Sequence, residues 1–126
     1  MGTHHVEKIE HVAVTVADVP RARTFYEGVL GLREVPRPES FDFPGAWYRL
    51  GNIDLHVIGR EHSDPPSRRH FALWVQDIRA TAEAIQNAGC PVLWEHKYKI
   101  RNIDRFFTED PDGNRIEVMG PDAGIT

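Results

Sequence analysis

Two six-residue stretches of nearly the same pattern, HVAVTV at His11–Val16 and HFALWV at His70–Val75, decide the predicted fold. An aspartate follows two residues after each stretch, and the two histidines are 59 residues apart, as are the two aspartates. Alternating apolar and polar residues rich in β-branched side chains predict strands. We therefore interpret each stretch as the first strand of one half of an internal duplication, with its histidine at a shared metal site.

Length and composition favour one globular domain over residues 1–126, with 40% hydrophobic and 27% charged residues. The net charge is -4 and the basic residues are interspersed with acidic ones, which argues against a nucleic-acid partner. Cys90 is the only cysteine, so no internal disulfide is expected and a reducing compartment fits best. No long apolar run or leader is visible, so we expect a cytoplasmic protein that does not cross a membrane.

The first half, about residues 8–60, is expected to contain one helix and four strands. Asp18 is a good helix N-cap with Pro20 in the first turn, and apolar residues at helical spacing continue to Gly31. A short strand is expected at 32–35, then a loop, and then a hairpin of strands 47–50 and 53–58 across Gly51-Asn52.

The second half, about residues 70–120, repeats this order after a polar linker at about 60–69 that contains Pro65-Pro66. Asp77 is expected to cap a helix that Gly89 ends, and strands are expected at 91–96, 103–108 and 115–119. The residues DPDGN at Asp110–Asn114 have strong turn chemistry between the last two strands. Each half alone is short for a stable domain.

Aligning the two halves pairs four residues with metal-ligand chemistry. His11 matches His70 in the first strands, and His56 matches Glu117 in the last strands. Strand alternation places all four on the face opposite the apolar core residues. A histidine at a strand start is more often a surface residue than a ligand, so the prediction depends on all four together. Three imidazoles and a carboxylate without a thiolate suit Zn, Ni, Co, Mn or Fe as the divalent metal ion.

Further motifs join these strands into a recognisable pattern. FYEGVLGL occupies Phe25–Leu32, and DPDGNRIE occupies Asp110–Glu117. Over residues 8–120 the chain resembles the vicinal oxygen chelate superfamily, which includes glyoxalase I, fosfomycin-resistance proteins, methylmalonyl-CoA epimerase and extradiol dioxygenases. The resemblance implies an α+β fold in which two βαβββ modules form an incomplete barrel around a metal site.

The resemblance also implies roles for individual residues. His11, His56, His70 and Glu117 match the four metal-ligand positions, and Glu117 matches a base that loosens from the metal; His96 is a weaker candidate base. The glyoxalase I branch commonly has glutamate at the position of His56, and the three-ligand branches do not use that position as a ligand. The resemblance further implies a homodimer, in which His11 and His56 of one chain could share a site with His70 and Glu117 of the other.

Several other residues are candidates for binding the substrate. Trp47 and Arg49 share a strand face, and Trp74 has the parity of His70, although a tryptophan packed in the core explains it as well. Lys97, Lys99, Arg101 and Arg105 precede the last hairpin and could bind an anionic substrate, or could form a solvated basic loop. Trp47, Arg49, Trp74, Arg101 and Arg105 are therefore the predicted substrate-binding residues.

Three classes of function follow from this site. The first is a metal-dependent enzyme of glyoxalase type, isomerase- or lyase-like, that binds the vicinal oxygens of a small substrate and stabilises an enolate or oxyanion. The second is a ring-cleaving extradiol-type dioxygenase, and a fosfomycin-type transferase is a weaker enzymatic alternative. The third is a non-catalytic protein that binds an antibiotic or another small molecule. Four ligand residues favour the first class.

Overall fold

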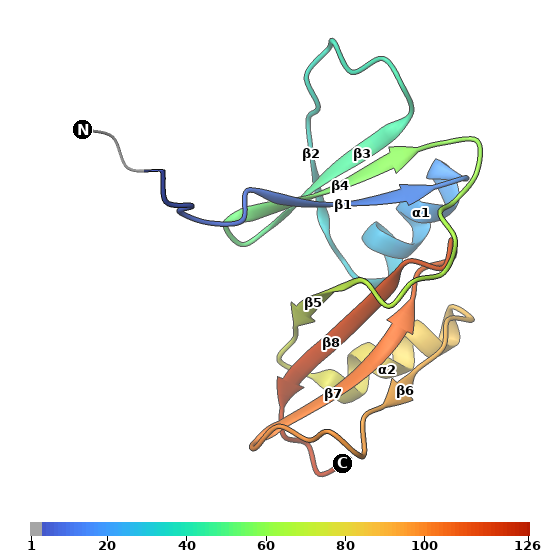
Figure 1. Ribbon diagram of the computed structural model, residues 1–126. Coiled ribbons are helices and arrows are strands. Elements are labelled where there is room, and N and C mark those ends of the chain that lie inside the picture. The colour runs from blue at the N-terminus through green and yellow to red at the C-terminus, as the bar shows by residue number, and fades with distance from the viewer. Residues whose placement is uncertain (1–3) are drawn as a thin grey trace.

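The computed structural model describes residues 4–126 and contains two similar modules, each a four-stranded mixed sheet with helical turns packed on one face (Figure 1). The first module consists of β1 (His11–Val16), α1 (Val19–Arg23), η1 (Thr24–Val29), β2 (Arg33–Val35), β3 (Gly45–Leu50) and β4 (Ile53–Gly59). The second consists of β5 (His70–Trp74), α2 (Ile78–Asn87), β6 (Leu93–Trp94), β7 (Ile103–Glu109) and β8 (Arg115–Pro121). The predicted α+β fold of two βαβββ modules is confirmed.

The two sheets have the same strand order and the same register. The orders are β1-β4-β3-β2 and β5-β8-β7-β6, with the first pair parallel and the others antiparallel. Ala13 lies opposite His56 in one sheet, and Ala72 lies opposite Glu117 in the other. Between residues 4 and 126 the two sheets stay separate and do not close into a barrel. The duplication therefore extends to the positions of the candidate ligands.

The helices begin where the sequence predicts. Asp18 accepts a hydrogen bond from the backbone N–H of Arg21, and Asp77 accepts one from that of Ala80, both at 3.0 Å. Such caps satisfy N–H groups that have no partner within the helix. The first helix is less regular than predicted, because after Arg23 it widens into the π-helical turn η1. Phe25 and Tyr26 are adjacent in this turn and both are buried.

One apolar core connects the sheets and the helices that cover them. Leu55 and Val57 in β4, and Ile116 and Val118 in β8, are at most 1% exposed. They alternate with His56 and Glu117, as the period of a strand requires. Burial of each such side chain contributes about 1.5–3 kcal/mol. The core packing therefore fixes which face carries the candidate ligands.

The turn between β7 and β8 joins the modules. The Tyr26 hydroxyl donates to Asp110 Oδ2 at 2.7 Å, and Asn114 Nδ2 donates to the Thr15 carbonyl at 2.9 Å. Asp112 Oδ1 accepts from the Ala17 N–H and from Arg21 Nη2, both at 2.9 Å. Residues of the second module thus satisfy polar groups of the first.

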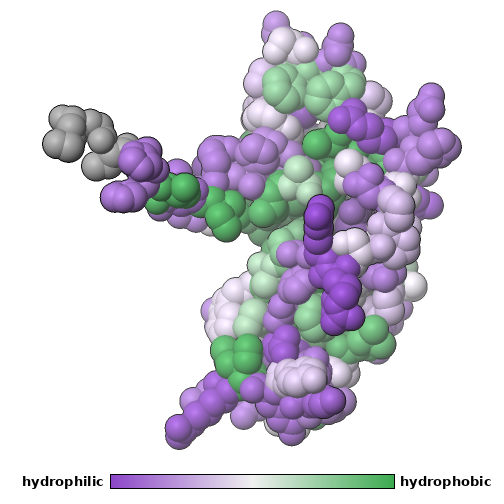
Figure 2. All heavy atoms as spheres, viewed as in Figure 1, coloured by the Kyte–Doolittle hydropathy of each residue, from purple (hydrophilic) through white to green (hydrophobic). Residues whose placement is uncertain are grey.

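Two surface features complete the fold. Within residues 4–126 none of the helices has the length and apolar character needed to cross a membrane. The segment before β1 projects from the body and leaves Val6 and Ile9 exposed (Figures 1 and 2). The surface is hollowed between the two modules below this segment (Figure 2).

Candidate metal centre

The first candidate pair, His11 and His56, lies side by side on β1 and β4. Their rings stack with centroids 4.1 Å apart and an interplanar angle of 18°. On the other side of His56, the Trp47 indole from β3 stacks with its centroid 3.9 Å from that of the imidazole and an interplanar angle of 5°. Because β4 lies between β1 and β3, the two neighbours cover opposite faces of the His56 ring.

His56 has a buried ring nitrogen that no described residue satisfies. Its side chain is 11% exposed, and among the described residues Nε2 has no hydrogen-bond partner. Asp54 Oδ2 is 3.8 Å away, which is too far for a hydrogen bond. Burial lowers the pKa of His56 below its usual value, and the neighbouring His11 lowers it further. A neutral imidazole with an unused lone pair is the form that binds a metal ion.

The second candidate pair, His70 and Glu117, lies on β5 and β8. His70 Nδ1 is 3.0 Å from the Arg68 carbonyl, and His70 Nε2 is 3.1 Å from Glu117 Oε1. A carbonyl can only accept, so Nδ1 carries the hydrogen. In the neutral ring, Nε2 then presents a lone pair to a carboxylate oxygen. Two acceptors this close require a cation between them, either a proton or a metal ion.

Arg105 holds the other oxygen of Glu117. Arg105 Nη1 donates to Glu117 Oε2 at 3.0 Å, and the two side chains are 13% and 10% exposed. The guanidinium also donates to the Tyr98 carbonyl and lies 3.9 Å from Glu95 Oε1. One carboxylate oxygen is therefore fixed by an arginine while the other faces His70.

The two pairs do not meet within one chain. Among residues 4–126, no three His, Cys, Asp or Glu side chains come close enough to hold one metal ion. The sequence predicts four residues around one ion, and the structure brings them together two by two. Each pair fits a metal in its chemistry, since imidazole and carboxylate groups are common ligands of divalent ions.

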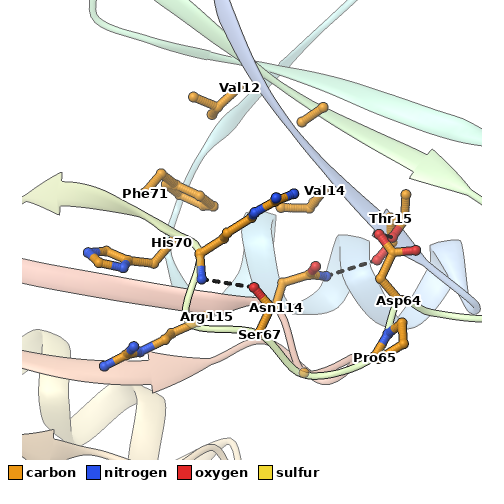
Figure 3. A pocket seen from close by; sticks show the side chains of 13 residues that line it. Val12, Val14, Thr15, Asp64, Pro65, Ser67, His70, Phe71, Asn114 and Arg115 are labelled. Atoms are coloured by element: carbon orange, nitrogen blue, oxygen red, sulfur yellow. Dashed lines mark hydrogen bonds between the residues drawn. The ribbon is translucent and has the colours of Figure 1, made fainter.

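A groove of about 700 Å³ separates edge strands β1 and β5. Val12 and Val14 line one side, and His70 and Phe71 line the other (Figure 3). Asn114 bridges its floor by its hydrogen bond to the Thr15 carbonyl (Figure 3). The groove follows the boundary between the modules, with one candidate ligand on its rim.

The comparisons with known proteins agree with this architecture. The family model of the Glyoxalase/Bleomycin resistance protein/Dioxygenase superfamily matches residues 8–118. The chain belongs to this superfamily. Among superfamily relatives, it is 30% identical to lactoylglutathione lyase from Haemophilus influenzae, with 89% of this chain and 91% of that protein covered. It is 24% identical to metallothiol transferase FosB from Bacillus licheniformis, with 94% of this chain and 78% of that protein covered.

A solved structure matches nearly all of this chain. It is a protein assigned to the glyoxalase family from Bacillus anthracis, 30% identical, with a TM-score of 0.82. The match covers 96% of this chain and 100% of that one. The fold that the sequence predicts from its resemblance is therefore the fold of this superfamily.

The predicted substrate-binding residues lie in different surroundings. Arg105 contacts Glu117 directly, and Trp47 contacts His56. Arg49 reaches His56 only through Asp54, which it binds at 2.5 Å. Arg101 is exposed just before β7. Trp74 is 54% exposed, so the alternative interpretation of it as a core residue is wrong.

Sequence reasoning missed the contacts that surround the two pairs. The sequence predicts Trp47 as a substrate-binding residue rather than as a ring stacked on a candidate ligand. It does not single out Phe107, whose ring centroid lies 5.2 Å from that of His70 in a T-shaped arrangement. The hairpin predicted at Gly51-Asn52 could have indicated the contact between Trp47 and His56. A turn that pairs Leu50 with Ile53 also pairs Trp47 with His56.

Proposed function

We propose that this chain is a metal-dependent enzyme of glyoxalase type, isomerase- or lyase-like, acting on a small substrate with vicinal oxygens. One observation supports this most strongly. Two pairs of residues with metal-ligand chemistry occupy the same register in the two duplicated sheets: His56 Nε2 has no partner among the described residues, and His70 Nε2 faces Glu117 Oε1 at 3.1 Å. The similarity to a lactoylglutathione lyase at 30% identity supports the isomerase or lyase class.

We further propose that the complete centre forms between two copies of the chain. His11 and His56 of one copy would then join His70 and Glu117 of the other. The separation of the pairs within one chain supports this arrangement, as do the apolar side chains of Val6, Ile9 and Trp74, which one chain leaves exposed. Each dimer would contain two equivalent centres.

The proposed chemistry is a proton transfer assisted by a Lewis acid. A divalent ion held by the four residues would supply electrophilic stabilisation to two neighbouring substrate oxygens. Glu117 would take a proton from one substrate carbon and return it to the adjacent carbon, so that the substrate is isomerised without net loss of atoms. Arg105 holds Glu117 Oε2 and so orients the oxygen that moves the proton.

Metal analysis of untagged protein tests the proposal. We expect about one nickel, zinc or cobalt ion per chain, and its loss in the variants His56→Ala and Glu117→Ala. Bound iron together with oxygen uptake on catechols would instead favour the ring-cleaving dioxygenase. Absence of bound metal under every loading condition would overturn the enzyme proposal and favour a non-catalytic binding protein. Thiol transfer to fosfomycin would favour the transferase class that the FosB similarity suggests.

Mixing two inactive variants tests the shared centre. His11→Ala damages the first module and Glu117→Ala the second, so a mixed dimer with shared centres has one doubly damaged centre and one intact centre. We expect metal binding and activity to return in the mixture. The control pair, His11→Ala with His56→Ala, damages the same module in both chains and should recover nothing. Failure of the first mixture to recover would contradict a shared centre.

A further inference from the structure

The strongest unexplained feature of the molecule is the aromatic stack around His56. Trp47, His56 and His11 come from three adjacent strands, and their rings form one column. The angle between Trp47 and His56 is 5°, so the indole lies flat on the imidazole. Offset aromatic stacking contributes about 0.5–1.5 kcal/mol beyond the area that it buries.

The stack restricts rotation of the His56 ring about its Cβ–Cγ bond, which sets the direction of the nitrogen that would bind a metal ion. Rotation about the Cβ–Cγ bond moves His56 Nε2 out of its present direction, and such torsions are broad in histidine. A flat neighbour on each face of the ring opposes this rotation. Unlike His70, whose Nδ1 is fixed by a carbonyl, His56 has only the 3.8 Å approach to Asp54 near its Nε2. Its orientation therefore depends on the rings that cover it.

Residues of the loop before β3 hold the Trp47 ring in place. Phe41 packs against Trp47 in a T-shaped arrangement, with ring centroids 5.3 Å apart and an interplanar angle of 84°. Arg37 Nη2 donates to the carbonyls of Phe41 at 3.2 Å and Phe43 at 2.6 Å, which ties the loop before β3 in place. The loop thus supports Trp47, and Trp47 supports His56.

We propose that Trp47 is a positioning residue that holds the His56 imidazole in its metal-binding orientation. This inference rests on the proposed function, because it takes His56 to be a ligand. It assigns Trp47 a role other than contact with the substrate, and the loop that contains Phe41 acts on the centre through it. Groups that orient metal ligands typically change metal affinity by 10–100-fold when they are removed.

Cobalt binding to the purified full-length protein provides the test, with titration followed by visible absorption and by tryptophan emission. Trp47→Leu keeps apolar bulk without a flat ring, and we expect it to weaken Co²⁺ affinity about tenfold. Trp47→Phe restores a ring and should stay close to wild type in affinity. Co²⁺ should quench much of the tryptophan emission of wild type and of Trp94→Phe, but much less in Trp47→Phe, because Trp47 is the tryptophan next to a ligand.

A double-mutant cycle separates positioning from a general loss of structure. His56→Glu retains a possible metal ligand but cannot stack, so Trp47→Leu should have almost no effect on Co²⁺ affinity in that background. An equal loss in both backgrounds would overturn the inference, as would unchanged affinity in Trp47→Leu. If His56→Ala also leaves Co²⁺ affinity unchanged, His56 is not a ligand, and that part of the proposed function fails instead. Circular dichroism of each variant confirms that it is folded.

Discussion

At the scale of single residues, Arg105 has two opposing effects on the candidate centre. It neutralises and orients Glu117, yet its positive charge lies where it repels a divalent ion. Both side chains are nearly buried, so removing one partner deprives the other charge of its main ionic contact. Arg105 therefore contributes to the stability of the metal-free protein while it reduces the electrostatic attraction of the centre for a metal ion.

The variant Arg105→Leu tests this balance. We expect the metal-free variant to lose about 1.5–3 kcal/mol of unfolding free energy, because nearly buried Glu117 loses its guanidinium partner and keeps only the contact with His70. Added Zn²⁺ or Ni²⁺ should then raise the melting temperature of the variant by more than that of wild type, since the ion replaces the missing positive charge. Thermal unfolding with and without metal measures both effects. An equal metal-induced shift in the two proteins would contradict this account.

The buried carboxylate of Asp104 makes the stability of the fold depend on pH. It is 1% exposed and accepts hydrogen bonds from the backbone N–H groups of Ala123, Ile125 and Thr126 at 2.7, 3.3 and 3.0 Å. Burial alone would raise the pKa of this carboxyl, but the hydrogen bonds outweigh burial and hold its pKa well below the usual range. The carboxylate therefore stabilises the fold above pH about 4, and this contribution is lost as the pH falls further.

We expect the free energy of unfolding to decrease between about pH 5 and pH 2, and Asp104→Asn to remove part of this slope. At pH 7 the variant should be less stable by about 1–3 kcal/mol, because the amide leaves buried donors unsatisfied. Urea denaturation at pH 7 and pH 3 measures both quantities. Glu83→Gln on the exposed side of α2 is a control that should leave the slope unchanged. The prediction fails if Asp104→Asn and wild type show parallel pH profiles.

At the scale of elements, the turn Asp110–Asn114 connects the modules, and Tyr26 reports on this connection. Tyr26→Phe removes the hydroxyl that donates to Asp110, which we expect to lower stability by about 0.5–1.5 kcal/mol. Tyr48→Phe is a matched control, since its hydroxyl donates to Glu27 within the first module. Amide hydrogen exchange in the turn should accelerate in Tyr26→Phe but not in Tyr48→Phe. Equal acceleration in both variants would rule out a specific connection.

Most of the elements could be predicted because their signals are local. Asp18 and Asp77 cap helices, and Gly51-Asn52 joins a hairpin, as their chemistry requires. The π-helical turn η1 was not predicted, and the strand predicted at 91–96 is limited to the two residues of β6. The turn η1 places two adjacent aromatic residues in the core, so tertiary packing outweighs the regular helical period there. β6 depends on its pairing with β7, which the residues of 91–96 do not specify alone.

At the scale of the whole molecule, the two pairs of candidate ligands could be predicted and their separation could not. Strand parity and duplication place His56 and Glu117 on equivalent faces, and this depends only on sequence within each module. The distance between the pairs depends on how the modules pack, which involves long-range contacts such as those of Asp112 with Ala17 and Arg21. The cytoplasmic location, the homodimer and the organisation as one domain over residues 1–126 stay predictions.

Metal binding and dimerisation should be coupled if two copies complete each centre. An ion that binds the dimer more tightly than the monomer must shift the equilibrium toward the dimer, by the same linkage that makes ligands stabilise folded proteins. We expect added Zn²⁺ or Ni²⁺ to lower the dimer dissociation constant and a chelator to raise it, as measured by sedimentation velocity over a range of concentrations. His56→Ala and Glu117→Ala should abolish the metal effect, whereas Glu83→Gln should retain it. A dissociation constant that is independent of metal in the wild-type protein would contradict a centre that two copies complete.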